Sequence, residues 1–167
     1  MSSRHEGESS VTIVSNSAED TSELGCELGE ALRGGEIVLL TGPLGSGKTT
    51  LVKGLARGLG VHRNVTSPSF VLEKTYEGRR TLRHIDLYRL DAREAFEFWH
   101  SLETGPDEIL AVEWGERISD LVEGTIRVNM EYCENPDARV LTVSWNDPAY
   151  GEIVRQAVSR WRERISR

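Results

Sequence analysis

The chain has few of the features that mark membrane, secreted or metal-scaffold proteins. Its 167 residues include two cysteines, too few for a disulfide framework and without the paired spacing of a zinc site. No apolar run approaches the roughly 18 residues of a membrane-spanning helix. The start, MSSRHEGESS, also lacks the apolar stretch of a secretory signal. We therefore expect a cytoplasmic protein with no membrane partner and with reduced cysteines.

Acidic residues outnumber basic residues, and the formal net charge is −7 at pH 7. Nonspecific binding to nucleic acid depends on lysine and arginine that release counterions from phosphates. Direct binding to DNA or tRNA is therefore not expected. The length suits one domain. Residues 1–10, rich in serine, glutamate and glycine, are expected to form a disordered tail, with a single domain over 11–167.

Hydrophobic patterns predict several strands. The stretches 36–40 (EIVLL) and 108–114 (EILAVEW) are apolar on both faces, as expected for central strands covered by helices on each side. Residues 69–88 contain two strand-like runs around Glu77 and Gly78, which indicates a β-hairpin. The stretches 125–132 and 139–145 alternate like antiparallel neighbours. A further strand is expected at 11–14.

Helix signals separate these strands and predict an α/β fold with a mixed central sheet flanked by helices. A capping pattern at Ser17 and Asp20 opens one helix, which Gly34 and Gly35 end. Apolar residues at helical spacing predict a second helix over 51–60. A short helix is expected at Asp91, capped with Glu94, and a last one after Asp147.

The most specific motif is GPLGSGKT at 42–49, which satisfies G-x-x-x-x-G-K-[ST] between a buried strand and a helix. Glycines let successive N–H groups point inward and cradle phosphates beside a helix N-terminus, so a side chain at Gly45 or Gly47 would obstruct the cradle. Lys48 would add charge at the outer phosphates, and the Thr49 hydroxyl would hold Mg²⁺. The motif predicts a P-loop NTPase fold that binds ATP or ADP with Mg²⁺. The residues of this stretch expected to bind the nucleotide are Gly42, Gly45, Ser46, Gly47, Lys48, Thr49 and Thr50.

Acidic residues near the ends of neighbouring strands are candidates for the rest of the site. Glu113 is the best candidate for a further magnesium ligand, although P-loop enzymes commonly use aspartate there. Asp86 could reach the same metal or orient an attacking water. His84 shares the strand face of Asp86, but a packed or surface histidine is the favoured interpretation. Trp114 could stack on the adenine, whereas packing is its more common role.

Four motifs in order carry a resemblance to a known family. They are GPLGSGKTT, NVTSPSFVLEKTY, HIDLYRL and AVEWGER. Together they resemble the TsaE family, small bacterial ATPases of tRNA threonylcarbamoyladenosine biosynthesis, over about residues 17–145. The resemblance implies Mg²⁺-dependent ATP hydrolysis. It also implies association with TsaD and TsaB, partner proteins that form and transfer the threonylcarbamoyl group onto adenosine 37 of tRNA, so that tRNA is met only indirectly.

The same resemblance implies roles for single residues. Thr49 and Glu113 would hold Mg²⁺, and Asp86 would be needed for catalysis together with Lys48. The segment 67–70 resembles a switch loop whose hydroxyl, here that of Ser69 where relatives often have threonine, lies near the γ-phosphate. Two further matches to nucleotide-flanking positions are looser: Thr21 and Arg139.

The mechanism expected from these residues is attack of water on the γ-phosphate of ATP, with charge offset by loop N–H groups and Lys48. No arginine finger is identified in the sequence, so slow turnover is expected for the isolated chain. One alternative is a small-molecule kinase, which would need a lid rich in arginine. Another is a nucleotide-gated binding module with negligible hydrolysis.

Overall fold

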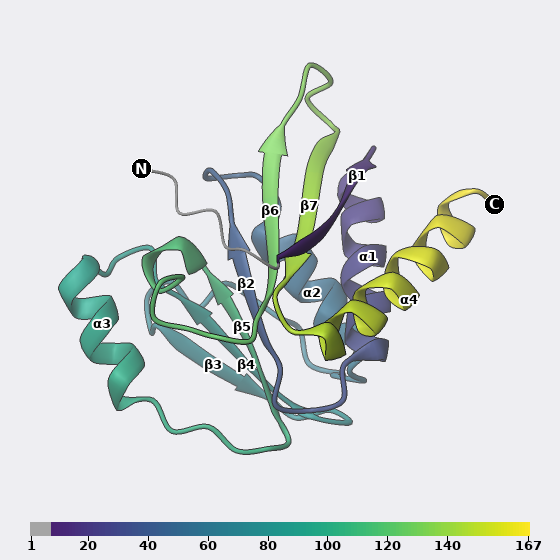
Figure 1. Ribbon diagram of the computed structural model, residues 1–167. Coiled ribbons are helices and arrows are strands. Elements are labelled where there is room, and N and C mark those ends of the chain that lie inside the picture. Colours follow the sequence, from purple (N-terminus) through teal and green to yellow (C-terminus); the bar gives the residue numbers. More distant parts are fainter. Residues whose placement is uncertain (1–7) are drawn as a thin grey trace.

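A computed structural model describes residues 8–167 and shows one mixed β-sheet with helices on both faces (Figure 1). Within these residues the sheet has seven strands in the order β1-β7-β6-β2-β5-β4-β3. The strands are β1 (Ser9–Ser15), β2 (Ile37–Thr41), β3 (Glu73–Tyr76), β4 (Thr81–Asp86), β5 (Glu108–Glu113), β6 (Ile126–Tyr132) and β7 (Arg139–Trp145). The helices are α1 (Ala18–Ala31), α2 (Lys48–Gly58), α3 (Ala92–Ser101) and α4 (Pro148–Ile165), with a short 3-10 turn η1 (Gly115–Arg117).

The apolar strand β2 lies at the centre of the sheet, as its sequence predicts. It pairs in parallel with β5 on one side and with β6 on the other. Val38 and Leu40 point into the core beneath α1, α2 and α4, and Leu39 points into the smaller core beneath α3. Because β2, β5 and β4 run in parallel, their carboxyl ends meet at the same edge of the sheet.

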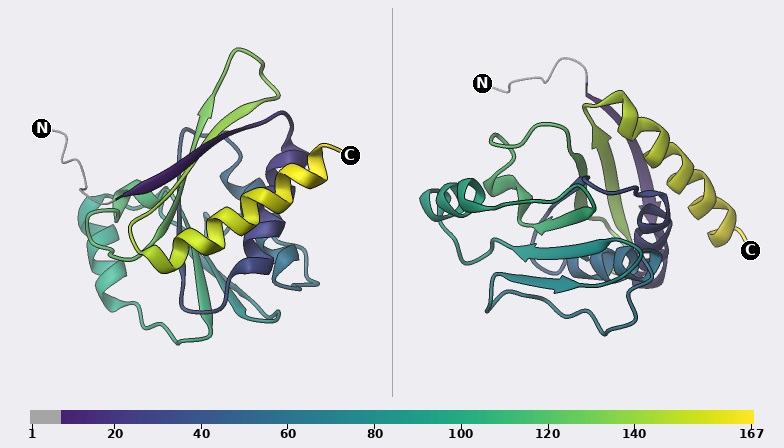
Figure 2. Two further views of the ribbon diagram at one scale, coloured as in Figure 1. Left: turned by 45° about the vertical axis from the view of Figure 1, so that its right-hand side comes forward. Right: turned by 90° about the horizontal axis from the view of Figure 1, so that it is seen from below.

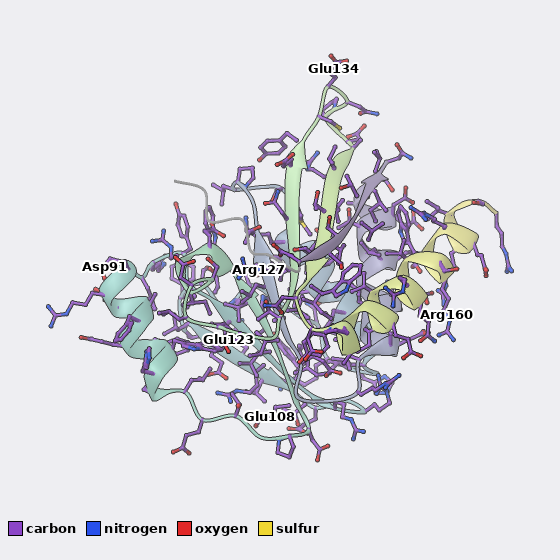
Figure 3. All side chains as sticks on the ribbon, in the orientation of Figure 1. Asp91, Glu108, Glu123, Arg127, Glu134 and Arg160 are labelled. Atoms are coloured by element: carbon purple, nitrogen blue, oxygen red, sulfur yellow. The ribbon has the colours of Figure 1, made fainter. Side chains whose placement is uncertain are left out.

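Helices cover the two faces unequally. Three of them, α1, α2 and α4, pack on the larger core, and α3 with η1 covers the other face. The right-hand view of Figure 2, in which the molecule is seen from below, shows α4 and α3 on opposite sides of the sheet. Figure 3 labels Asp91, which caps the N-terminus of α3. It also labels Glu134, at the tip of the β6–β7 hairpin. No helix of residues 8–167 combines the length and apolar character needed to cross a membrane.

Most of the expected elements are confirmed. Ser17 caps α1, Asp91 and Glu94 form the capping box of α3, and Asp147 caps α4. The hairpin is β3–β4, and β6 and β7 pair antiparallel. The prediction of a disordered tail over 1–10 is wrong for Ser9 and Ser10, because these two residues pair with β7. Residues 1–7 of the predicted tail lie outside the described residues. Two serines in a polar stretch carry no hydrophobic pattern that would have predicted this pairing.

Candidate nucleotide-binding site

The glycine-rich loop joins the end of β2 to the start of α2, which is the setting that the motif requires. Gly42 has φ +135°, and a Cβ atom there would come within 2.4 Å of the Met130 carbonyl oxygen. Gly47 has φ +109°, but a Cβ there would meet only ordinary contacts at 3.8 Å. A side chain at Gly47 would therefore not clash with the rest of the chain, and its expected obstruction of a bound phosphate stays a prediction. The left-handed backbone is what requires glycine at this position.

The β6–β7 hairpin holds the outer side of this loop. The Tyr132 hydroxyl donates to the Leu44 carbonyl oxygen. The Arg139 guanidinium donates to the carbonyl oxygens of Ser46 at 3.1 Å and Gly45 at 3.3 Å. Since the C=O and N–H groups of a trans peptide unit point in opposite directions, outward carbonyls leave the following N–H groups turned the other way. Arg139 therefore braces the loop through its backbone.

Replacing Arg139 with alanine is expected to weaken nucleotide binding about tenfold. The change removes two charge-assisted hydrogen bonds to partly exposed loop carbonyl oxygens, where water compensates much of the loss; a net loss of about 1.4 kcal/mol corresponds to the tenfold change. Equilibrium titration with a fluorescent ADP analogue measures the effect. Arg160→Ala on the exposed side of α4 is the matched control (Figure 3). Equal affinities for Arg139→Ala and the parent would contradict the brace.

Lys48 begins α2 and is 5% exposed, with its ammonium turned onto the loop. Its Nζ donates to the carbonyl oxygens of Gly42 at 2.6 Å and Pro43 at 2.9 Å. It also lies 4.2 Å from the centroid of the Trp114 ring. Burial lowers the pKa of Lys48, and the carboxylates of Glu116, Glu113 and Asp86 oppose that shift. The two carbonyl acceptors hold the ammonium against the loop.

Thr49 and Glu113 meet across the gap between α2 and β5. The Thr49 hydroxyl donates to the Glu113 carboxylate, with Oγ1 lying 2.8 Å from Oε1 and 3.0 Å from Oε2. Glu113 is 3% exposed and ends β5. His84 Nε2 lies 2.5 Å from Oε2 of the same carboxylate. His84 is thus packed, as expected, but it also has a polar partner within the site.

Asp86 lies beside Glu113, because the two residues are register partners at the ends of β4 and β5. Its carboxylate accepts from the backbone N–H of Tyr88 at 2.9 Å and from the Ser67 hydroxyl at 3.3 Å. Burial is the main cause that raises the pKa of Asp86, and the neighbouring Glu113 adds to it. The two hydrogen bonds oppose the shift. Two buried carboxylates side by side repel each other, and a cation bound between them would offset that repulsion.

The raised pKa of Asp86 predicts that Asp86→Asn stabilises the folded protein at neutral pH. Between the ordinary aspartate pKa and the raised one, the folded state binds more protons than the unfolded state. The stability from this group is therefore lost as pH rises through the raised value. An uncharged asparagine should therefore raise the melting temperature at pH 7. Calorimetry tests this, and a melting temperature below that of the parent would contradict it.

Two cavities flank the loop. The first, of about 390 Å³, lies between α2, β4 and β5. The second, of about 380 Å³, lies between α1, the loop and β7. Gly45, Gly47 and Thr50 line both. Gly42 lines neither cavity. The other expected residues divide between them: the first is lined by Lys48, Thr49, Ser69, Asp86, Glu113 and Trp114, and the second by Thr21, Ser46 and Arg139.

This division places Trp114 and Thr21 in different surroundings. Trp114 has φ +58°, packs its ring 5.1 Å from that of Tyr88 and lines the cavity that contains Lys48. Thr21, on α1, is buried; its hydroxyl lies 2.7 Å from Ser15 Oγ, and it lines the cavity beyond the loop. A nucleotide whose phosphates occupied the loop would have room for its base beside Thr21 and Arg139. Trp114 would then lie at the phosphate end.

The segment 67–72 borders the first cavity through Ser67 and Ser69. Ser67 contacts Asp86, while Ser69 lines the cavity. Phe70 is 83% exposed, and the Arg89 guanidinium lies 4.2 Å from the centroid of its ring. Arg89 lines the same cavity. No sequence pattern marks Arg89 as an arginine finger, because only the fold brings it to the cavity that Lys48 also lines.

The residues present fit a magnesium ion that is bound together with a nucleotide. Thr49 and the two carboxylates supply oxygen atoms, which Mg²⁺ prefers. Residues 8–167 contain no group of three or more histidine, cysteine, aspartate or glutamate side chains arranged to hold a metal by themselves. Mg²⁺ usually takes one or two protein ligands and completes its shell with phosphates and water. The donor set suits that mode and not a structural metal site.

Comparison with known proteins gives consistent matches. Residues 15–141 match a family model described as threonylcarbamoyl adenosine biosynthesis protein TsaE. A tRNA threonylcarbamoyladenosine biosynthesis protein TsaE from Treponema pallidum (strain Nichols) is 43% identical over 141 residues, 80% of this chain and 100% of the relative. The protein of the same name from Mycobacterium tuberculosis (strain H37Rv) is 38% identical over 138 residues, 76% of this chain and 82% of the relative.

A solved structure shares the fold. The crystal structure of YdiB from Bacillus subtilis superposes with a TM-score of 0.75 and 26% sequence identity, covering 92% of this chain and 97% of that one. The family match includes the loop at 42–49, Asp86 and Glu113. The similarity therefore spans the same part of the chain in which the two cavities lie.

Proposed function

Because the chain belongs to the TsaE family of threonylcarbamoyl adenosine biosynthesis proteins, we propose that it hydrolyses ATP, with Mg²⁺, in that modification of tRNA. The observation that supports hydrolysis most directly is the cluster of Lys48, Thr49, Asp86 and Glu113 around one cavity. A site that only binds phosphate has no need of two adjacent buried carboxylates, because they repel it. A site that positions a metal ion and an attacking water, in contrast, needs carboxylates of this kind.

The loop would bind the phosphates through its backbone. The N–H groups after Gly45 and the N-terminus of α2 supply donors and partial positive charge to the phosphates. Lys48 would exchange its carbonyl acceptors for phosphate oxygens, bringing one full charge to the site. Thr50 and Ser46 line the cavities on either side of this path. Thr21 and Arg139 would flank the base.

The carboxylates would act at the γ-phosphate end. Thr49 and Glu113 would hold Mg²⁺, which when bound offsets the charge of the phosphates. Asp86 would orient the attacking water or accept its proton, because its second oxygen is held only by Ser67. Ser69, which lines the same cavity, would place its hydroxyl near the γ-phosphate. We expect slow turnover by the isolated chain, with ADP and phosphate as products.

The partners proposed for this activity are TsaD and TsaB, the proteins that would form and transfer the threonylcarbamoyl group. Hydrolysis would drive or reset their complex. The negative net charge of the chain supports contact with tRNA through these partners instead of directly. A cytoplasmic location is part of the same proposal, since tRNA modification takes place there.

Phosphate release from Mg·ATP, measured for the chain alone and with the two partners, tests the proposal. We expect slow release by the chain alone and faster release with partners, together with threonylcarbamoyladenosine in tRNA detected by mass spectrometry. Transfer of the γ-phosphate to a small acceptor without free phosphate would instead show a kinase. Nucleotide affinity with no turnover even in the complex would show a binding module.

A further inference from the structure

His84 is buried within the site and hydrogen-bonds Glu113. It belongs to β4, faces Ala111 of β5 in the register and has no exposed surface. Since side chains alternate along a strand, His84 and Asp86 lie on the same face, and the imidazole reaches diagonally to Glu113. Its Nε2 lies 2.5 Å from Glu113 Oε2, and Glu113 accepts from Thr49 on the same carboxylate.

Packing alone does not account for a histidine at this position. The other ring nitrogen, Nδ1, is buried and has no hydrogen-bond partner in the described part of the chain. A buried polar atom without a partner is destabilising, whereas an apolar side chain would fill the space without that cost. What the imidazole adds in return is the hydrogen bond to Glu113. That bond fixes which way the carboxylate faces.

We propose that His84 is a positioning residue, whose Nε2–H holds the Glu113 carboxylate toward Thr49 so that a divalent cation meets pre-oriented oxygens. The proposal rests on the proposed function, because it assigns Glu113 to the cation. Without His84 the carboxylate is free to rotate about its side-chain bonds, and ordering it again costs conformational free energy. Partners that orient metal ligands typically change metal affinity about 10–100-fold.

A matched pair of substitutions separates positioning from packing. In His84→Gln the amide nitrogen lies near the place of Nε2 and can still donate to Glu113. In His84→Asn the shorter side chain reaches only about as far as Nδ1, which has no partner. The chain with bound ADP is titrated with Mn²⁺, a spectroscopic probe for Mg²⁺, and bound Mn²⁺ is measured by electron paramagnetic resonance. ADP affinity without metal is measured in EDTA.

We expect His84→Asn to bind Mn²⁺ about tenfold more weakly than the parent, with His84→Gln close to the parent and all three alike toward ADP in EDTA. In a Glu113→Gln background, His84→Asn should cause no further loss. Equal Mn²⁺ affinity of His84→Asn and the parent would overturn the inference, as would equal weakness of His84→Gln and His84→Asn. A parent chain that binds ADP but no Mn²⁺ would instead remove the metal site of the proposed function. Melting curves of each variant show that it is folded.

Discussion

Replacing Lys48 with alanine should lower the affinity for Mg·ATP by about 10–100-fold and reduce phosphate release by about 10²-fold or more. A charged hydrogen bond contributes about 1.5–3 kcal/mol, which converts to the first figure. Loss of a cation where charge develops in the transition state adds the second effect. Lys48 begins the helix and lies against the loop carbonyl oxygens, whereas Arg89, which lines the same cavity, lies over the Phe70 ring and does not share that position.

Lys53→Ala is the matched control, because Lys53 lies on the same helix but is exposed. It should leave affinity and phosphate release unchanged. Thermal melting of both variants distinguishes lost binding from lost folding, since Lys48 also holds the Gly42 and Pro43 carbonyl oxygens. If Lys48→Ala remained folded and bound Mg·ATP as tightly as the parent, the phosphate cradle would have to lie elsewhere.

Replacing Asp86 with asparagine should reduce turnover by about 10²-fold or more without weakening nucleotide binding. An amide can accept the hydrogen bond from Tyr88 as the carboxylate does, but it cannot take a proton from water. Binding of the anionic phosphates should become equal or tighter, because one of two adjacent negative charges is removed. Single-turnover phosphate release and ADP titration separate the two effects.

The comparison variant is Asp107→Asn, which removes a carboxylate that is 77% exposed and pairs only with Arg80 at 3.4 Å. It should change neither turnover nor melting temperature appreciably. The combination of higher melting temperature and lost turnover in Asp86→Asn would show a carboxylate kept for chemistry at the expense of stability. Full turnover by Asp86→Asn would remove Asp86 from the mechanism.

The parts of the site that lie close together in the sequence could be predicted. The apolar strand, the glycines, Lys48 and Thr49 follow one another within one strand, loop and helix, so the pattern carries its own context. The two carboxylates could be placed at strand ends because buried runs precede them. Their direct adjacency depends on the register of β4 and β5, which no local pattern specifies.

Contacts between distant parts of the chain could not be predicted in the same way. Arg139 lies 93 residues beyond Ser46 in the sequence. Its hydrogen bonds to the loop form only because β6 pairs with β2 and brings the β6–β7 hairpin beside the loop. The same holds for the bond between His84 and Glu113, 29 residues apart. One signal was present for His84, namely its place two residues before Asp86 on the same strand face. A histidine on an apolar strand nevertheless suggests packing until its partner is seen.

The central claim is that the amides of the loop at 42–47, with Lys48 and Thr49, bind the phosphates of a nucleotide. The most direct measurement is the change in backbone amide resonances when Mg·ATP or Mg·ADP is added to the isotopically labelled protein. The account predicts saturable shifts that are largest for Gly45, Gly47, Lys48 and Thr49, and much smaller along α4. Saturable binding that moved other resonances and left those of the loop unchanged would contradict it.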